Sequence, residues 1–125
     1  MGDEVNIQDG AVIHCTYQKS PTNIGNQVTI GHNAIVHGCT IKDRVLIGMG
    51  AIVLDDCIIE SDSIIAAGAV VTMWTHVKSG EIYAGVPARK VKEGDFKNQL
   101  LDLANKYVAY SKWFKDLSLI HIWRC

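Results

Sequence analysis

An aliphatic residue followed by small and polar residues returns about every six positions between Ile24 and Val77. The members of this first inward series are Ile24, Ile30, Val36, Ile41, Ile47, Val53, Ile59, Ile65, Val71 and Val77. A period of six fits neither an amphipathic helix nor an alternating hairpin. Self-similarity at a fixed period is typical of a solenoid, whose units bury a face only by stacking on one another. The repeat therefore predicts a mainly β protein built as a parallel β-helix.

A second inward series follows the first by four residues. It comprises Val28, Ala34, Thr40, Val45, Ala51, Cys57, Ser63, Ala69 and Thr75. Cys57 is accordingly expected in the core, where a free cysteine behaves as a small apolar residue. The repeat extends backwards through Ile13 and Ile7 to Met1. Residues 18–23 interrupt the frame and are predicted to leave the solenoid as a loop at a corner, and the unit at residues 36–40 is one residue short, which indicates a tightened corner.

The period changes near the end of the chain. Pro87 lacks a backbone donor and is expected to end strand pairing. From Asp95 to Asp116 apolar residues recur at spacings of three and four, which predicts one helix with Asp95 as its N-cap. We therefore expect a β-helix over 1–92, a helix over 93–116 packed on the outside of its own or a neighbouring β-helix, and an unstructured or artefactual tail at 117–125.

Composition limits the classes of function. The chain has 125 residues, 48% hydrophobic and 20% charged, which suits one soluble domain. A net charge of −1 with scattered basic residues gives no footprint for nucleic acid or an anionic membrane. The longest uncharged apolar run, 64–74, is shorter than the ~20 residues of a membrane span. No basic, apolar leader is seen, so a cytoplasmic location is predicted.

The frame assigns the histidines to faces of a three-sided prism. His14 follows Ile13 and His37 follows Val36, which places them at equivalent positions of one face on adjacent coils, about 4.8 Å apart. Two outward imidazoles stacked in this way can share one metal with nitrogen distances of about 2.1 Å. His32 follows Ile30 on a different face, and His76 lies at a corner without a histidine partner, where we expect an ordinary surface residue.

A trimer can bring the separate histidines together. In a ring with three-fold symmetry, the face that carries the pair meets a neighbour's face that carries His32, and such an interface closes. Three nitrogens and one open position are what a catalytic zinc requires. Gln8 and Asp9 follow Ile7 one coil below His32 and should line the same cleft. Asp9 suits a hydrogen bond to a ligating imidazole or an interface ion pair, and Gln8 suits orientation of a water or small substrate.

Several segments resemble the gamma-class carbonic anhydrase-like family over about residues 1–114. They are Asn6-Ile7-Gln8-Asp9-Gly10, Ile13-His14-Cys15, Ile30-Gly31-His32-Asn33-Ala34-Ile35-Val36-His37-Gly38-Cys39, Ile47-Gly48-Met49-Gly50-Ala51 and Tyr83-Ala84-Gly85-Val86-Pro87-Ala88. The resemblance implies a left-handed β-helix with a C-terminal helix, assembled as a homotrimer, and a zinc ion held between subunits by residues matching His14, His32 and His37. It also implies catalytic roles for Gln8 and Asp9 and a place near the cleft for Tyr83.

Two departures from the family pattern stand out. Family members begin with further coils and an arginine-glycine-aspartate segment, so the resemblance implies that this sequence is truncated at its N-terminus. An acidic residue that shuttles protons in some members is matched by Tyr17, and tyrosine, with an ordinary pKa near 10, is a poor shuttle at neutral pH.

The resemblance therefore implies a lyase, a zinc-dependent carbonic anhydrase that interconverts carbon dioxide and bicarbonate, with iron(II) or cobalt(II) as alternative metals. Two other functions are kept open. Gly85-Val86-Pro87-Ala88-Arg89 also occurs in similar form in coenzyme A-dependent hexapeptide acyltransferases, which use a single general-base histidine. A trimeric metal-binding scaffold without catalysis is the third hypothesis. No nucleic-acid or membrane partner is expected.

Overall fold

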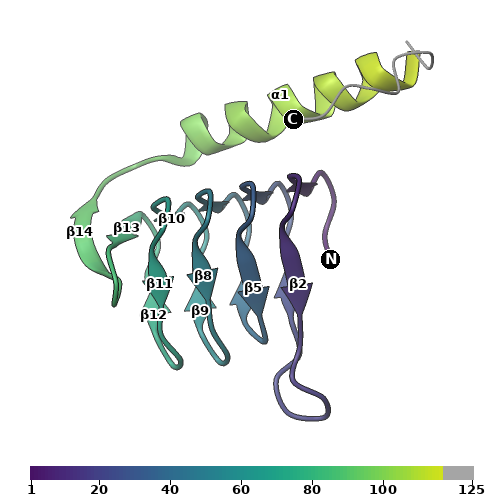
Figure 1. Ribbon diagram of the computed structural model, residues 1–125. Helices are drawn as coiled ribbons and strands as arrows, with labels where there is room; N and C mark the ends of the chain where they lie inside the picture. The colour runs from purple at the N-terminus through teal and green to yellow at the C-terminus, as the bar shows by residue number, and fades with distance from the viewer. Residues whose placement is uncertain (117–125) are drawn as a thin grey trace.

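A computed structural model describes the backbone of residues 1–116 and the side chains of residues 1–106. Very short strands follow one another around a prism, and one long helix follows them (Figure 1). In chain order the elements are β1 (Asn6–Ile7), β2 (Val12–His14), β3 (Asn23–Ile24), β4 (Thr29–Ile30), β5 (Ile35–His37), β6 (Thr40–Ile41), β7 (Leu46–Ile47), β8 (Ile52–Val53), β9 (Ile58–Ile59), β10 (Ile64–Ile65), β11 (Val70–Val71), β12 (His76–Val77), β13 (Glu81–Ala84), β14 (Arg89–Glu93) and α1 (Lys97–Asp116).

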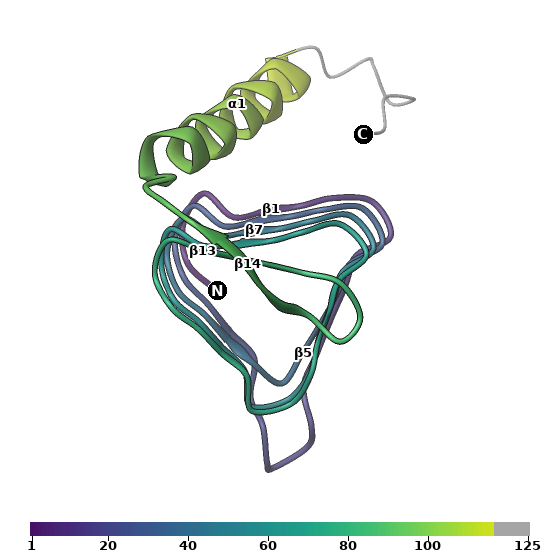
Figure 2. The ribbon, with the colours of Figure 1, turned by 90° about the vertical axis from the view of Figure 1, so that its left-hand side faces the viewer.

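The strands form the three faces that the repeat predicts. Sheet A has the order β1-β4-β7-β10-β13-β14, sheet B the order β11-β8-β5-β2, and sheet C the order β12-β9-β6-β3. Successive coils pair in parallel, except for the final antiparallel pair β13 and β14. Viewed along the stacking axis, the coils superpose as a three-sided outline (Figure 2). The prediction of a parallel β-solenoid with one C-terminal helix is confirmed.

The corners explain why the period is six. Apart from the loop between β2 and β3, the corners have one residue with positive φ directly before an inward residue, for example Asn33 (59°) before Ala34 and Asp62 (64°) before Ser63. Asparagine and aspartate adopt this region more readily than most side chains, because their short polar groups bond locally to the backbone. A strand of two or three residues and one such corner make up a typical unit of the coils.

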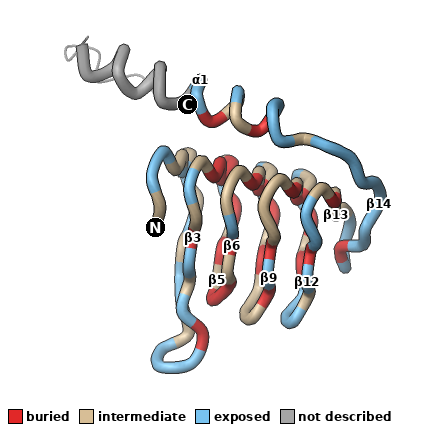
Figure 3. The backbone as a smooth tube through the Cα atoms, turned by 180° about the vertical axis from the view of Figure 1, so that it is seen from behind, coloured by how far each residue is buried: buried red, intermediate tan, exposed pale blue. Residues whose placement is uncertain are grey.

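The core consists of the inward residues of both series. The largest fully buried side chains include Ile30, Ile41, Ile47, Ile59 and Ile65, and buried residues, in red, recur from coil to coil in Figure 3. Burying one such side chain contributes about 1.5–3 kcal/mol. Cys57 is 1% exposed, as predicted.

One inward position was assigned wrongly from the sequence. Cys39, which is 1% exposed, occupies the slot that the repeat gave to Thr40, which is half-buried. The reason is the short unit at this corner: Gly38 has φ of 59°, so the chain turns inward one residue early. Burial also raises the pKa of the Cys39 thiol to about 12.

The expectation that Pro87 ends strand pairing was also wrong. Residues 85–88 form the turn of a hairpin, and β14 returns antiparallel to β13 with a register shift at Ile82/Tyr83. The parallel coils do end here, because the chain reverses direction. The hairpin closes this end of sheet A (Figure 1).

Helix α1 runs back over the outer side of sheet A (Figures 1 and 2). Its first turn is capped by Asp95, whose Oδ1 accepts a hydrogen bond from the backbone N–H of Lys97 at 3.2 Å. Leu100 and Ala104 are buried, and Leu103 borders the sheet. The helix therefore packs on its own β-solenoid. The predicted tail at 117–125 lies outside the described residues, and the division of the chain into separate units stays a prediction.

Within the described residues no helix has the length and apolar character to cross a membrane.

Candidate metal centre

Two histidines stack on sheet B. Strands β2 and β5 pair in the register Ile13↔Val36 and His14↔His37, so the alignment predicted from the repeat is confirmed. The ring centroids lie 4.7 Å apart with an interplanar angle of 22°. His14 Nδ1 and His37 Nε2 are 2.9 Å apart and hydrogen-bonded. Two imidazole nitrogens of adjacent coils therefore face each other at the surface.

A carboxylate supports the second ring from the coil above. Asp55 Oδ1 is in contact with His37 Nδ1. Thr16 Oγ1 donates a hydrogen bond of 2.5 Å to Asp55 Oδ2. The hydrogen bond from Thr16 and then the contact with His37 hold the pKa of Asp55 below its ordinary value. An ionised acceptor therefore occupies the Nδ1 side of His37 and leaves Nε2 toward His14.

The pair has the kind of nitrogen donors that zinc uses. Two nitrogens that each lie about 2.1 Å from a tetrahedral zinc are separated by roughly 3.4 Å. The observed 2.9 Å between the facing nitrogens is shorter and corresponds to a hydrogen bond, so the two rings would move apart slightly to share one metal ion. A ligating imidazole commonly gives its other N–H to a carboxylate, which is the arrangement of His37 and Asp55. The two histidines alone supply half of a ligand set.

His32 lies beside a groove at a different corner of the prism. It follows β4 in a turn and is half-buried. The groove has a volume of about 400 Å³ and lies between sheet A and α1, lined among others by Gln8, His32, Met49 and Leu103. Gln8 and His32 share this groove, as the face count predicted. Most of the remaining lining is aliphatic or glycine, so these two side chains provide much of its polarity.

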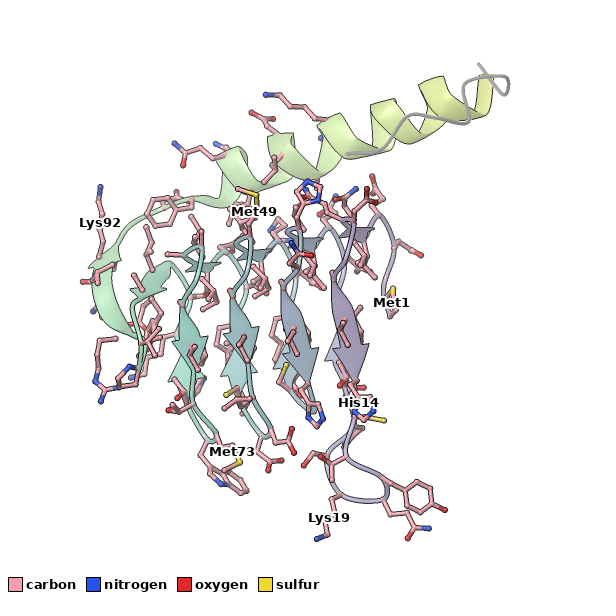
Figure 4. The ribbon with its side chains drawn as sticks, in the orientation of Figure 1. Met1, His14, Lys19, Met49, Met73 and Lys92 are labelled. Atoms are coloured by element: carbon pink, nitrogen blue, oxygen red, sulfur yellow. The ribbon has the colours of Figure 1, made fainter. Side chains whose placement is uncertain are left out.

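Within one chain the groove and the stacked pair are separate. Figure 4 shows Met49, from the groove, near α1, whereas His14 lies at the opposite end of the sheet B strands. Among the residues that the structure describes, no group of three or more histidine, cysteine, aspartate or glutamate side chains is placed to hold a metal ion. His32 can therefore join His14 and His37 only when it comes from another copy of the chain.

Three other predicted residues occupy distinct places. Asp9 is exposed and does not line the groove; its backbone carbonyl accepts a hydrogen bond from Asn33 N–H. Tyr83 pairs in register with Ile65, is half-buried and packs against the core. It does not border the groove in this chain. Tyr17 is 82% exposed, in the loop that projects beside the histidine pair. Their predicted roles remain predictions.

Asp55 and Thr16 were missed by the sequence reasoning, which proposed Asp9 as the acceptor behind a ligand. The available signal was the difference in corner length: Val36 is level with Val53 and Ile41 with Ile59, so the upper corner has one residue more, which can lie above His37. His76, expected to be an ordinary surface residue, pairs with Glu60 at 3.0 Å.

Similarity to known proteins covers nearly the whole chain. Residues 38–72 match the family described as "Bacterial transferase hexapeptide (six repeats)". Gamma carbonic anhydrase 1, mitochondrial, of Arabidopsis thaliana is 43% identical over 98 residues, covering 74% of this chain. The chain spans only 36% of that relative's length. Protein YrdA of Escherichia coli (strain K12) is 40% identical over 93% of this chain and 67% of its own.

The fold has a close match among solved structures. The crystal structure of a putative acetyltransferase from Bacillus cereus superposes with a TM-score of 0.87 at 33% identity, covering 94% of this chain and 69% of that chain. The neighbours thus include proteins named for carbon dioxide hydration and for acyl transfer, on the same solenoid.

Proposed function

Because the chain belongs to the gamma-class carbonic anhydrase-like family of hexapeptide-repeat proteins, we propose that it interconverts carbon dioxide and bicarbonate at a divalent metal, zinc in the first place, held between subunits of a homotrimer. One observation supports this most directly. His14 and His37 present facing nitrogens 2.9 Å apart, with Asp55 behind His37. An acyltransferase that uses one general-base histidine has no need of such a pair.

The outer surface of sheet B supports the trimeric assembly. Its outward positions form an apolar row, Val12↔Ile35↔Ile52↔Val70, beside the stacked histidines. Helix α1 covers sheet A and leaves sheet B uncovered (Figure 2). An apolar row beside a half-complete ligand set suits an interface with the His32 corner of a second copy. The third ligand would then come from that copy.

The residues would divide the work as follows. His14, His37 and the His32 of another copy would hold the metal, and Asp55 would fix the His37 ring. Zinc in such a site would supply Lewis-acid chemistry that lowers the pKa of a ligand water to about 7. Gln8, in the groove beside His32, would orient carbon dioxide or bicarbonate through its amide. Asp9, exposed on the coil below, would serve as an interface partner. Tyr83 lies in the inward row of sheet A, and its predicted place near the cleft of the assembled trimer remains a prediction.

Stopped-flow measurement of carbon dioxide hydration tests this function. The purified chain is loaded with zinc, cobalt(II) or iron(II), its metal content is determined by elemental analysis, and a His14→Ala/His37→Ala double variant serves as control. Bound metal and hydration above that control are expected. Absence of all three metals from the protein contradicts the proposal. Metal binding without hydration of carbon dioxide would support the hypothesis of a metal-binding scaffold without catalysis.

Coenzyme A-dependent acyl transfer is the second candidate, favoured by the similarity to the putative acetyltransferase. The two functions make opposite predictions in a thermal-shift experiment. Zinc should raise the melting temperature of a carbonic anhydrase of this type and acetyl coenzyme A should not. Stabilisation by acetyl coenzyme A alone favours the transferase.

A further inference from the structure

The corner that carries Asp55 differs in length from the corner beneath it. From Val36 to Ile41 the chain takes five steps, whereas from the paired residue Val53 to Ile59 it takes six. The upper corner therefore has one residue more than the lower corner. Gly38 and Asp56 are the positive-φ residues of the two corners, and Asp55 is the extra residue. Its side chain occupies space that a full-length lower corner would fill.

Gly38 is required for this approach. A Cβ atom at Gly38 would lie 2.6 Å from Asp55 Oδ1 and 3.0 Å from the Cβ of Ser20. Its φ of 59° also lies in the region that side chains rarely adopt. The Gly38 N–H donates to Thr22 Oγ1 at 2.9 Å and to the His14 carbonyl at 3.0 Å. These hydrogen bonds fix the backbone directly after His37 to the coil of His14, at the place that the Asp55 carboxylate approaches.

The contact between Asp55 and His37 determines where a proton is held. An ionised carboxylate accepts hydrogen bonds and has no proton to donate, so His37 Nδ1 must be the donor. In the neutral ring Nε2 is then bare and accepts from His14 Nδ1, at 2.9 Å. A metal ligand needs such a bare nitrogen.

We propose that Asp55 is a positioning residue: it holds His37 as the Nδ1–H tautomer and thereby directs the bare Nε2 toward the site shared with His14. The same carboxylate accepts the hydrogen bond from Thr16 at the base of the projecting loop, so loop and ligand are fixed by one group. The effect on metal affinity rests on the proposed function, whereas the effect on the tautomer does not.

The neighbouring residue provides a matched control. Asp56 Oδ1 accepts a hydrogen bond from Ser20 Oγ at 3.1 Å and anchors the other side of the same loop. Asp56→Asn and Asp55→Asn each remove one negative charge at this corner. Asparagine also tolerates the positive φ of residue 56. The two asparagine variants therefore test the loss of charge, whereas the difference between Asp55→Ala and Asp55→Asn reports on the loss of the acceptor that contacts His37.

The first experiment uses ¹⁵N NMR of the imidazoles in the metal-free full chain. Wild-type protein and Asp56→Asn should show His37 protonated at Nδ1. Asp55→Asn should keep this tautomer, because its amide oxygen accepts the same hydrogen bond, and Asp55→Ala should lose it. A wild-type His37 protonated at Nε2 overturns the proposal whether or not any variant folds, and so does an Asp55→Ala spectrum with the wild-type tautomer.

The second experiment measures affinity for zinc alone. Asp55→Ala should bind zinc about 10–100-fold more weakly than wild type, the usual loss for a residue that orients a ligating histidine. Asp55→Asn and Asp56→Asn should stay below the roughly tenfold lower end of that range. Equal affinity in Asp55→Ala and wild type overturns the inference about positioning. A wild-type protein that binds no zinc overturns the proposed function instead, and the tautomer measurement still decides the role of Asp55.

Discussion

Sheets B and C carry similar aliphatic residues on their inward faces and different kinds of residue on their outward faces. Their inward rows are Ile13, Val36, Val53 and Val71 in sheet B, and Ile24, Ile41, Ile59 and Val77 in sheet C. The outward row of sheet B, Val12, Ile35, Ile52 and Val70, is wholly aliphatic and lies beside His14 and His37. The outward row of sheet C reads Asn23, Thr40, Ile58 and His76.

The difference shows that the inward and outward residues of a short strand are subject to separate constraints. Inward residues are set by the stacking of coils and are nearly interchangeable between the sheets. Outward residues are free of that constraint, so an aliphatic row and a histidine pair on one sheet alone indicate a use beyond folding. We therefore expect changes inside the two sheets to act alike and changes outside them to act differently.

The largest expected effect comes from the inside. Ile59 is fully buried, and Ile59→Ala should lower the free energy of unfolding by about 2–5 kcal/mol, through lost burial and the cavity left behind. The preceding residue Ile58 points outward and is 39% exposed, so Ile58→Ala should change the free energy of unfolding by less than about 0.5 kcal/mol. Chemical denaturation measures both. In sheet B, Val53→Ala should likewise cost more than Ile52→Ala. Equal losses of stability in Ile58→Ala and Ile59→Ala would contradict the distinction between inward and outward positions.

The next effect separates the histidines of the two sheets. His37→Ala should weaken zinc binding by more than about 100-fold, because the removed group is a proposed ligand and losing a group that merely orients one already costs up to that amount. His76→Ala on sheet C should leave zinc affinity unchanged, since His76 pairs with Glu60 away from the stacked rings. Competition titration with a zinc chelator measures both variants. Similar losses in the two would show that binding is nonspecific.

A smaller effect is expected on assembly. Ile52→Lys places a charge in the aliphatic row of sheet B, and burying it unpaired between subunits is costly. We expect the dissociation constant of the trimer to rise by more than about tenfold, a change of roughly 1.4 kcal/mol. Ile58→Lys places the same charge on sheet C and should leave the assembly unchanged. Sedimentation velocity over a dilution series compares them, and equal dissociation of both variants would exclude sheet B as the specific interface.

Much of this fold could be predicted because a period of six fixes the face of every residue. The frame gave the inward rows, the register of His14 with His37 and the shared location of Gln8 with His32. It failed where one unit loses a residue, because the period does not tell which residue of the corner is missing. Gly38, which can adopt positive φ directly before Cys39, was the local signal that pointed to Cys39 rather than Thr40.

The candidate site was predictable only in part, for a related reason. Register places two backbones side by side, but the contact of Asp55 with His37 depends on a side chain crossing from one coil to the next. That crossing exists because the corner below is short and lacks a Cβ at Gly38. The turn at Pro87 was misjudged because a missing N–H limits one residue, whereas pairing of β13 with β14 is decided by the whole hairpin.

The smallest effect on stability is expected at the corner between β11 of sheet B and β12 of sheet C. Trp74 occupies the positive-φ position there with φ of 69°, where the coils below have Asp56 and Gly38. A bulky side chain in this region costs roughly 1–3 kcal/mol, and asparagine is several-fold enriched there. Trp74→Asn should therefore stabilise the protein by about 0.5–1 kcal/mol, less than the full strain because Trp74 also loses its own contacts. Trp74→Phe keeps the strain and removes the exposed indole, so its midpoint in urea should match wild type. If both variants gain equally, relief of backbone strain is not the cause, and the corner imposes no residue preference of its own.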